Sequence, residues 1–401
     1  MTVVLAFSFL LKELLRRFRV PVVVSQILAG ILLGLPLLKS LVFSGDSLSS
    51  VELLSQLGIT FLLFLAGWEI DFRKVIRYAG DVLLIAFSSA LLPFVLGFLF
   101  IYLLYGESLL AAGYDPVIVA LVFGVSLSVT SEATKVKVLA DLGKLKTKLA
   151  AIMLGAGTLD DIIEVLALAS VLALVHVGGG VDLYMIPVDI ILFGLFILLS
   201  FKVLSNVLKY VERKETDVDL FLLVLIIMFG MVGLSDILGL GYLIGAIAGG
   251  FTLQWIVSRK RHKTRREKFE EEEIFEGVKL VALSFLAPFF FLNIGLNFSL
   301  DYLFVNPLLL AGALVVAFAG KILGTLMVKP FTKLTWRQLY LVGWAMNSRG
   351  AVELIIALTA YSYQLIPGEV FSILVVTSLA TTLTFPFVIQ RHINRNPKIM
   401  D

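Results

Sequence analysis

Long apolar stretches separated by short polar loops make up almost the whole chain. They lie at 1–17, 21–38, 51–70, 80–105, 114–140, 146–175, 184–209, 217–238, 240–257, 276–298, 305–328, 337–361 and 367–390. A stretch of about 20 apolar residues is long enough to cross a bilayer as a helix. The pattern therefore predicts an all-α polytopic membrane protein with about 13 transmembrane helices.

The loops between these stretches alternate in their content of lysine and arginine. The basic loops lie around 16–19, 73–77, 144–148, 209–214, 259–266, 329–337 and 391–398. The loops at 44–50, 107–114, 177–184, 297–302 and 361–369 hold almost none. Because basic loops stay in the cytoplasm, we expect the N-terminus outside the cell and the C-terminus inside. The longest loop, 258–275, has a basic half and then an acidic half, which predicts a charged cytoplasmic linker.

Composition agrees with a membrane location and narrows the chemistry. Of the 401 residues 59% are hydrophobic and 16% are charged, with a mean hydropathy of +0.99. The chain has no cysteine, which excludes disulfides and thiolate metal sites. Its three histidines fall in loops or at segment ends, so no histidine relay crosses the membrane. We find no nucleophile–base pair, metal cluster or phosphate loop, and expect neither an enzyme nor a cofactor.

Two adjacent aspartates lie in the middle of one apolar stretch. Asp160 and Asp161 interrupt the run LAAIMLGAGTLDDIIEVLALASVLAL at 149–174. A carboxylate at bilayer depth costs several kcal/mol, and two neighbouring carboxylates do not easily both stay ionised without a cation or a basic partner. The pair predicts a site that binds cations or protons.

Two further charges lie within the apolar stretches. Glu164 follows Asp160 by one helical turn, and we favour a structural ion pair for it over direct cation binding. Lys321 lies inside 305–328 and either snorkels to the cytoplasmic edge or pairs with one aspartate, the interpretation that we favour. A desolvated lysine beside a carboxylate is stable when charged, and its proton can leave when a cation arrives.

Polar residues interrupt the stretch 114–140 at mid-span. The segment Ser126–Thr134 is polar, small and β-branched, and contains Glu132. Two structures fit such a segment: an intact helix with back-bonded hydroxyls, or an unwound helix whose carbonyls and hydroxyls coordinate a cation. Glu132 favours the unwound helix. The hydroxyls concerned belong to Ser128, Thr130 and Ser131.

A second interruption falls in 337–361, at Asn347–Gly350. Arg349 and Glu353 are four residues apart and can pair on one helix face. The interrupted stretches take the middle place in two triplets, 80–175 and 305–390. Broken segments in corresponding positions of two halves indicate a transporter binding site.

These features divide the chain into four parts. We expect N-terminal scaffold or dimerisation helices and the start of the core at 1–79, a core repeat at 80–175, linking and scaffold helices at 176–304, and a second core repeat at 305–401.

Several segments, in order, resemble the monovalent cation:proton antiporter-2 family of the sodium/proton antiporter superfamily. They are PVVVSQILAGILLGLP, LGITFLLFLAGWEIDF, SVTSEATKVKVLADLG, LDDII, SDILGLGYLIGAIAGG, APFFFLNIGLNFSL and NSRGAVELIIA. Each match alone is weak, but together in this order they are specific. The resemblance implies an inverted repeat with two crossed discontinuous helices in a core domain, a separate dimerisation domain, and a homodimer in the plasma membrane.

The resemblance also implies roles for individual residues. Asp161 resembles the main carboxylate that binds Na⁺ or protons. Asp160 resembles the carboxylate that pairs with a membrane lysine, whose place Lys321 takes. We add Ser131 to the candidate ion-binding residues because its hydroxyl lies in the interrupted segment. Thr130 resembles the polar residue at the crossing. Adjacent aspartates are associated in the family with electrogenic exchange and pH homeostasis. The chain departs from the family pattern through added charges at Glu132, Lys135, Arg349 and Glu353.

The function implied is exchange of Na⁺ or Li⁺ for H⁺ by alternating access, and three alternatives stay open. The first is K⁺/H⁺ exchange on the same architecture. The second is a K⁺ efflux protein of the same family, which the lack of an expected nucleotide-binding domain disfavours. The third is a sodium-coupled symporter of an organic solute, which the titratable aspartate pair disfavours. We expect no nucleic-acid partner.

Overall fold

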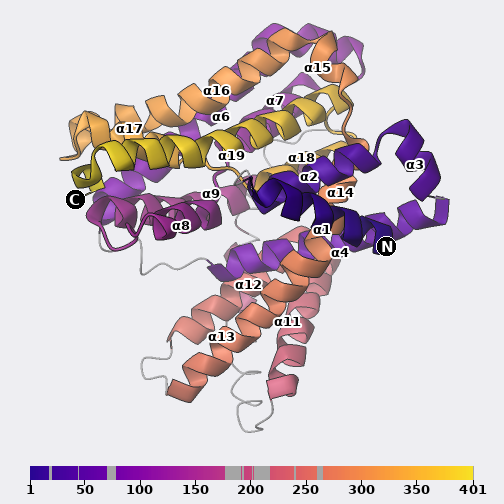
Figure 1. Ribbon diagram of the computed structural model, residues 1–401, viewed down its shortest axis with the longest axis horizontal. Helices are drawn as coiled ribbons and strands as arrows, with labels where there is room; N and C mark the ends of the chain where they lie inside the picture. Colours follow the sequence, from indigo (N-terminus) through magenta and orange to yellow (C-terminus); the bar gives the residue numbers. More distant parts are fainter. Residues whose placement is uncertain are drawn as a thin grey trace. The chain divides into compact units, whose positions relative to one another are not determined.

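A computed structural model describes residues 1–17, 20–43, 45–69, 78–176, 191, 194–200, 202, 217–238, 241–259 and 265–400. This described part of the chain is helical and holds no strand (Figure 1). It divides into two compact units. Unit 1 comprises Met1–Leu11, Ala29–Ile70 and Leu168–Leu296, and unit 2 comprises Lys12–Leu28, Asp71–Ala167 and Asn297–Asp401.

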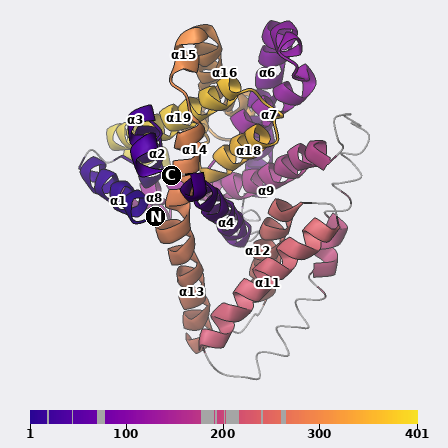
Figure 2. The same ribbon diagram turned by 90° about the vertical axis from the view of Figure 1, so that its right-hand side faces the viewer.

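Unit 1 is built mainly from α4, α11, α12 and a long composite helix. Its helices are α3 (Pro36–Val42), α4 (Gly45–Glu69), α11 (Asp217–Ile237), α12 (Tyr242–Arg259), α13 (Arg265–Leu280), the π-helical turn Val281–Leu286 and α14 (Ala287–Asn297). Figure 2 shows α11 and α12 lying together. The close packing of α4 on α12 depends on glycine, since a Cβ at Gly250 would clash with the Phe64 carbonyl. Helices α1 (Thr2–Arg16) and α2 (Val22–Leu33) are divided between the units.

Unit 2 contains two triplets, each with a broken helix between two continuous helices (Figure 1). The first is α6 (Ala79–Ala111), the broken pair α7 (Pro116–Ser128) and α8 (Glu132–Asp141), and α9 (Lys148–His176), whose residues from Leu168 onward belong to unit 1. The second is α16 (Pro307–Met327), the broken pair α17 (Trp336–Ala345) and α18 (Ala351–Ser362), and α19 (Gly368–Arg395). Shorter helices are α15 (Asp301–Val305), Lys329–Phe331 and Pro397–Met400. Helix α6 packs on α16, and α7 packs on α18.

The starts of the broken helices are encoded locally. Asp115 caps α7, because its carboxylate accepts from the Val117 amide at 2.8 Å and Pro116 takes the first helical position. Thr335 and Gln338 form a capping box at the start of α17. These caps satisfy amides that would otherwise stay unpaired.

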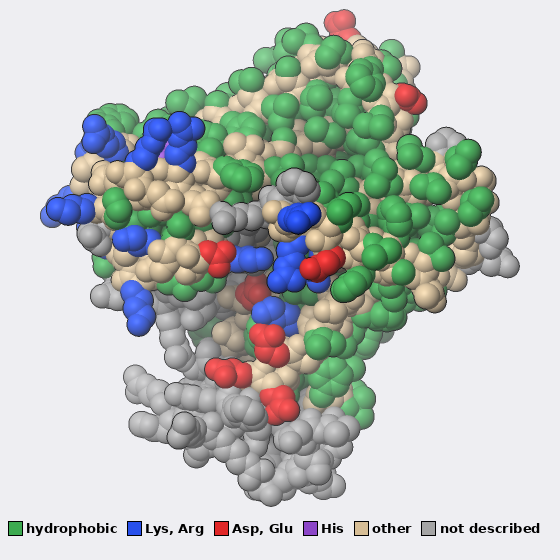
Figure 3. Space-filling view, viewed as in Figure 1, with side chains coloured by type: hydrophobic (Ala, Val, Ile, Leu, Met, Phe, Trp, Pro, Cys, Tyr) green, Lys and Arg blue, Asp and Glu red, His purple; other side chains and the backbone are tan. Residues whose placement is uncertain are grey.

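One end of unit 2 collects three of the predicted basic loops. A buried apolar cluster there joins Leu139 and Leu149, Leu334 and Leu339, and Met400, which flank those loops. Lys and Arg side chains gather at this end, whereas hydrophobic side chains cover much of the rest of the same face (Figure 3). The exposed lysine and arginine residues of these three loops are Lys146, Lys148, Lys333, Arg337, Arg391, Arg395 and Lys398. Their common location agrees with loops on one side of a membrane.

Within the described residues the structure follows the predicted segments, with differences at several boundaries. Helix α4 begins at Gly45 and α6 continues to Ala111, so both extend into the loops predicted at 44–50 and 107–114. The stretch 21–38 was predicted as one helix, but it breaks at Gly34–Leu35, because Pro36 starts a new helix at its first position. The linker predicted at 258–275 is largely helical: α12 extends to Arg259 and α13 begins at Arg265. The segment 184–209 lies mostly outside the described residues. Within them, five helices are long and apolar enough to cross a membrane, so the count of about 13 stays a prediction.

Candidate functional site

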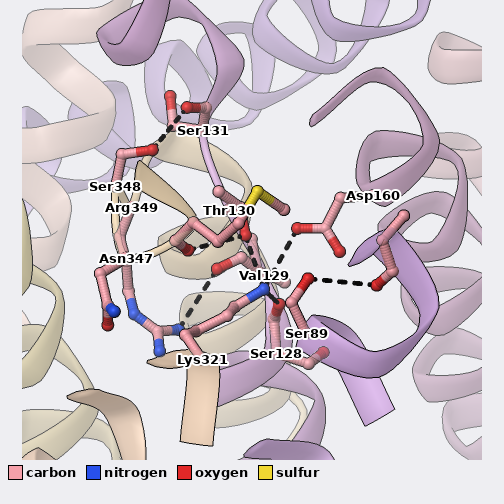
Figure 4. A network of polar contacts seen from close by, with 12 residues as sticks. Ser89, Ser128, Val129, Thr130, Ser131, Asp160, Lys321, Asn347, Ser348 and Arg349 are labelled. Atoms are coloured by element: carbon pink, nitrogen blue, oxygen red, sulfur yellow. Dashed lines mark hydrogen bonds and ion pairs between the residues drawn. The ribbon is translucent and has the colours of Figure 1, made fainter. Parts of the chain in front are cut away.

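The two broken helices cross at their extended segments. After α7 ends at Ser128, Val129 and Ser131 have extended backbones with ψ of 145° and 122°. The Ser131 amide donates to the Ser348 carbonyl at 2.7 Å, and the Ser348 hydroxyl donates to the Ser131 carbonyl at 2.8 Å (Figure 4). The predicted unwound helix is confirmed at both interruptions, and each satisfies backbone groups of the other.

The last carbonyls of α7 are bound by side chains of the second triplet. Arg349 donates to the carbonyls of Ser126 and Leu127, each at 2.7 Å, and to that of Val129 at 3.4 Å. Lys321 donates to the Ser128 carbonyl. The C-terminal end of a helix carries partial negative charge, which these cations offset. The carbonyls that we expected to coordinate a transported cation are thus occupied by Arg349 and Lys321.

Lys321 also forms the predicted ion pair with Asp160. Its ammonium lies 3.2 Å from Asp160 Oδ2 and 2.6 Å from the Thr130 hydroxyl, with both charged side chains buried (Figure 4). Together with the Ser128 carbonyl these acceptors use all three N–H groups of the ammonium. Asp160 Oδ1 has no hydrogen-bond partner among the described residues. One carboxylate oxygen of the pair is therefore uncommitted.

The other predicted carboxylates of α9 lie on the same helix. Asp161 follows Asp160 directly and is half-buried. Glu164 lies one turn further on, and its side chain falls outside the described part of the structure. The predicted Na⁺ site at Asp161 and the role of Glu164 stay predictions.

Arg349 and Glu353 form the predicted pair. The guanidinium lies 3.4 Å from Glu353 Oε1, and both side chains are buried. Glu353 lies in the first turn of α18, and Glu132 begins α8, so each second half-helix has a carboxylate where the helix end is partly positive. Glu132 accepts from the Thr158 hydroxyl of α9 at 3.0 Å.

Two residues of this site, Ser348 and Thr158, were not predicted from the sequence, although their positions indicate a role there. Ser348 lies inside the interruption predicted at Asn347–Gly350, and its position opposite Ser131 follows if the interruptions cross. Thr158, which holds Glu132, precedes Asp161 by three residues and so lies near it on α9. A polar residue one turn from a membrane aspartate is the pattern that would identify it.

The crossing leaves no room for a side chain at Gly350. A Cβ there would lie 2.7 Å from Ser131 Cβ and 2.8 Å from Ser131 Oγ. We expect Gly350→Ala to separate the segments and to destabilise the protein by about 1–3 kcal/mol, measured as a lower thermal unfolding midpoint in detergent. The matched control is Gly106→Ala in α6, where the nearest atom, Pro116 Cβ, is 3.7 Å away. Equal midpoints for the two variants would contradict the tight crossing.

Fold and site together define a helical membrane protein with a core of two crossed broken helices and a buried ion pair at their crossing. The chain belongs to the family described as "Sodium/hydrogen exchanger, transmembrane", whose model matches residues 3–392.

Relatives and a solved structure agree with this assignment. The chain is 27% identical over 381 residues to "Na(+)/H(+)-K(+) antiporter GerN" of Bacillus cereus, covering 95% of this chain and 92% of that protein. It is 28% identical over 378 residues to "Na(+)/H(+) antiporter" of Enterococcus hirae, and the match covers 94% of this chain and 92% of that protein. The fold is similar to that of the sodium proton antiporter MjNhaP1 from Methanocaldococcus jannaschii, with a TM-score of 0.70 at 16% identity over 98% of this chain and 95% of that chain.

Proposed function

We propose that the protein is a secondary active antiporter that exchanges Na⁺ or Li⁺ for H⁺ across the plasma membrane by alternating access. The observation that carries the proposal is the buried Lys321–Asp160 pair at the helix crossing, next to Asp161. A buried pair of titratable groups beside a second carboxylate lets protons and a cation compete for one place. The family membership and the naming of both relatives as antiporters support the same activity.

In the proposed cycle, Asp161 binds either a proton or the transported cation, with Asp160, Thr130 and Ser131 around it. Cation binding draws Asp160 away from Lys321. A neutral amine keeps two N–H donors and one lone pair, so it cannot donate to three acceptors. Loss of the Asp160 contact therefore allows Lys321 to release its proton, which would be the second proton carried per cation and would make exchange electrogenic.

The proposal includes a topology and an assembly. The N-terminus lies outside and the C-terminus in the cytoplasm, and the gathering of exposed bases at one end of unit 2 supports this orientation. We infer a homodimer from the resemblance to the family.

Exchange of K⁺ for H⁺ is the second candidate. It is favoured by the relative from Bacillus cereus, which is named an Na(+)/H(+)-K(+) antiporter. The arrangement of Asp160, Asp161 and Lys321 would serve either cation, and the experiment below separates them.

The test is cation-induced collapse of a preset ΔpH in proteoliposomes, with Na⁺, Li⁺ and K⁺ added separately. We expect Na⁺ and Li⁺ to collapse the gradient and Asp161→Asn to abolish the response, because an amide neither carries a proton nor offers a negative charge. The matched control, Asp141→Asn, changes an exposed aspartate at the end of α8 and should transport like wild type. Collapse by K⁺ alone would show that the transported cation is K⁺ and not Na⁺ or Li⁺. Undiminished transport by Asp161→Asn would refute the proposed site.

A further inference from the structure

Lys135 is a buried lysine that the proposed cycle does not use. It projects from α8, is fully buried, and its ammonium contacts the Met346 sulfur at 3.8 Å. Among the described residues no carboxylate lies within ion-pair distance of it. Burial of an ammonium without such a partner is costly, so its retention calls for a functional explanation.

The ammonium packs against the helix that carries the aspartates. A Cβ at Gly157 would clash with Lys135 Nζ and would lie 3.7 Å from Glu132 Cγ, so the charge occupies the space that a side chain at this position would fill. Gly157 precedes Asp161 by four residues, and side chains at this spacing are neighbours on one helix face, with Cβ atoms about 6 Å apart. The Lys135 charge therefore lies roughly one turn from the proposed cation-binding carboxylate.

The charges of the core indicate what Lys135 does there. Among the described residues the buried charged groups balance, with three acids and three bases: Glu132, Asp160 and Glu353 against Lys135, Lys321 and Arg349. When all six are ionised their charges cancel, and half-buried Asp161 follows Asp160 directly on α9. Without Lys135 these buried groups would carry one negative charge in excess, which would strengthen the attraction of a cation to this part of the core.

We propose that Lys135 is an affinity-determining residue, a tethered ammonium that competes with the transported cation and weakens cation binding at Asp161. The inference rests on the proposed function. Met346 places the same ammonium against the second broken segment, since the Met346 carbonyl accepts from the Thr130 hydroxyl at 3.1 Å. The Lys135 ammonium thus lies between α9 and the second broken helix, and Gly157 is the residue that makes room for it.

The test compares Lys135→Met, Gly157→Ala and the control Lys137→Met, an exposed lysine of the same helix. Two quantities are measured at one alkaline pH: KM and kcat for Na⁺ in proteoliposomes, and the Na⁺ concentration that gives half-maximal thermal stabilisation in detergent. For a unit charge about 7 Å away at an effective dielectric near 20, we expect Lys135→Met to lower both Na⁺ concentrations about fiftyfold. The Cβ of Gly157→Ala displaces the ammonium, so it should shift both in the same direction.

The outcomes separate this inference from the proposed function. A lower KM with an unchanged or lower kcat supports it, because a merely structural defect reduces kcat or the folded fraction without tightening cation binding. If wild type transports Na⁺ but Lys135→Met binds Na⁺ with unchanged or weaker affinity, the inference is overturned and the proposed function stands. If Lys135→Met does not fold, an unchanged Na⁺ affinity in Gly157→Ala overturns it. Absence of any Na⁺ response in wild type would overturn the proposed function itself.

Discussion

Arg349→Met is expected to destabilise the protein more than any other single substitution in the core. It leaves the carbonyls of Ser126 and Leu127 without their donor and Glu353 as a buried charge without its partner. Removing one partner of a buried ion pair costs about 3–5 kcal/mol. We expect a large fall in the thermal unfolding midpoint and in the yield of monodisperse protein, both measured by fluorescence-detected size-exclusion chromatography after heating.

The double variant Arg349→Met/Glu353→Gln is the informative control. The second substitution neutralises the stranded carboxylate, but the carbonyls of α7 still lack their donor. The thermal unfolding midpoint of the double variant should therefore lie between those of Arg349→Met and wild type. Full recovery would mean that the contacts to α7 contribute little. A single variant that unfolds at the wild-type temperature would show that Arg349 does not hold the broken helix.

Lys321→Met is expected to change the electrical character of transport. If Lys321 carries the second proton, the variant exchanges one proton per cation and becomes electroneutral. In proteoliposomes with a K⁺ gradient and valinomycin, an imposed potential should stimulate wild type and leave the variant unaffected. Because Lys321→Met strands Asp160 in the core, its folded fraction has to be measured alongside.

Asp160→Asn and the double variant Asp160→Asn/Lys321→Met complete this test. The double variant removes both charges and should be better folded than Lys321→Met, with the same insensitivity to potential. Full electrogenic activity in both single variants would show that the pair carries no proton, and the pair would then serve stability alone.

The sequence predicted the core of the site because its signals are local. A polar break in an apolar stretch is visible without any partner, and this located both interruptions at Ser126–Thr134 and Asn347–Gly350. The pairing of Lys321 with an aspartate followed from charge, because opposite charges at membrane depth are stabilised by pairing with each other. The Arg349–Glu353 pair followed from helical spacing alone.

What the sequence did not predict depends on contacts between distant residues. Nothing in the spacing around Arg349 indicates that it reaches the carbonyls of α7, because those acceptors belong to the backbone and carry no residue signature. The packing of Lys135 against Gly157 was not predicted for the same reason. A glycine in a helix indicates that another group packs closely there, but it does not indicate which group. The break before Pro36 was encoded locally, and a proline inside a predicted helix should have ended it there.

The hydrogen bonds from Lys321 and Arg349 to the carbonyls of α7 constrain the order in which the protein inserts and folds. The donors are synthesised long after the carbonyls they bind, with sequence separations of 193 for Lys321 and Ser128 and 223 for Arg349 and Ser126. In lipid an unsatisfied backbone carbonyl costs several kcal/mol. The first triplet therefore cannot reach its final form during its own insertion. The newly made chain has to keep water or another donor at the end of α7 until the second triplet enters the bilayer, which makes maturation of the core a late, post-insertion event.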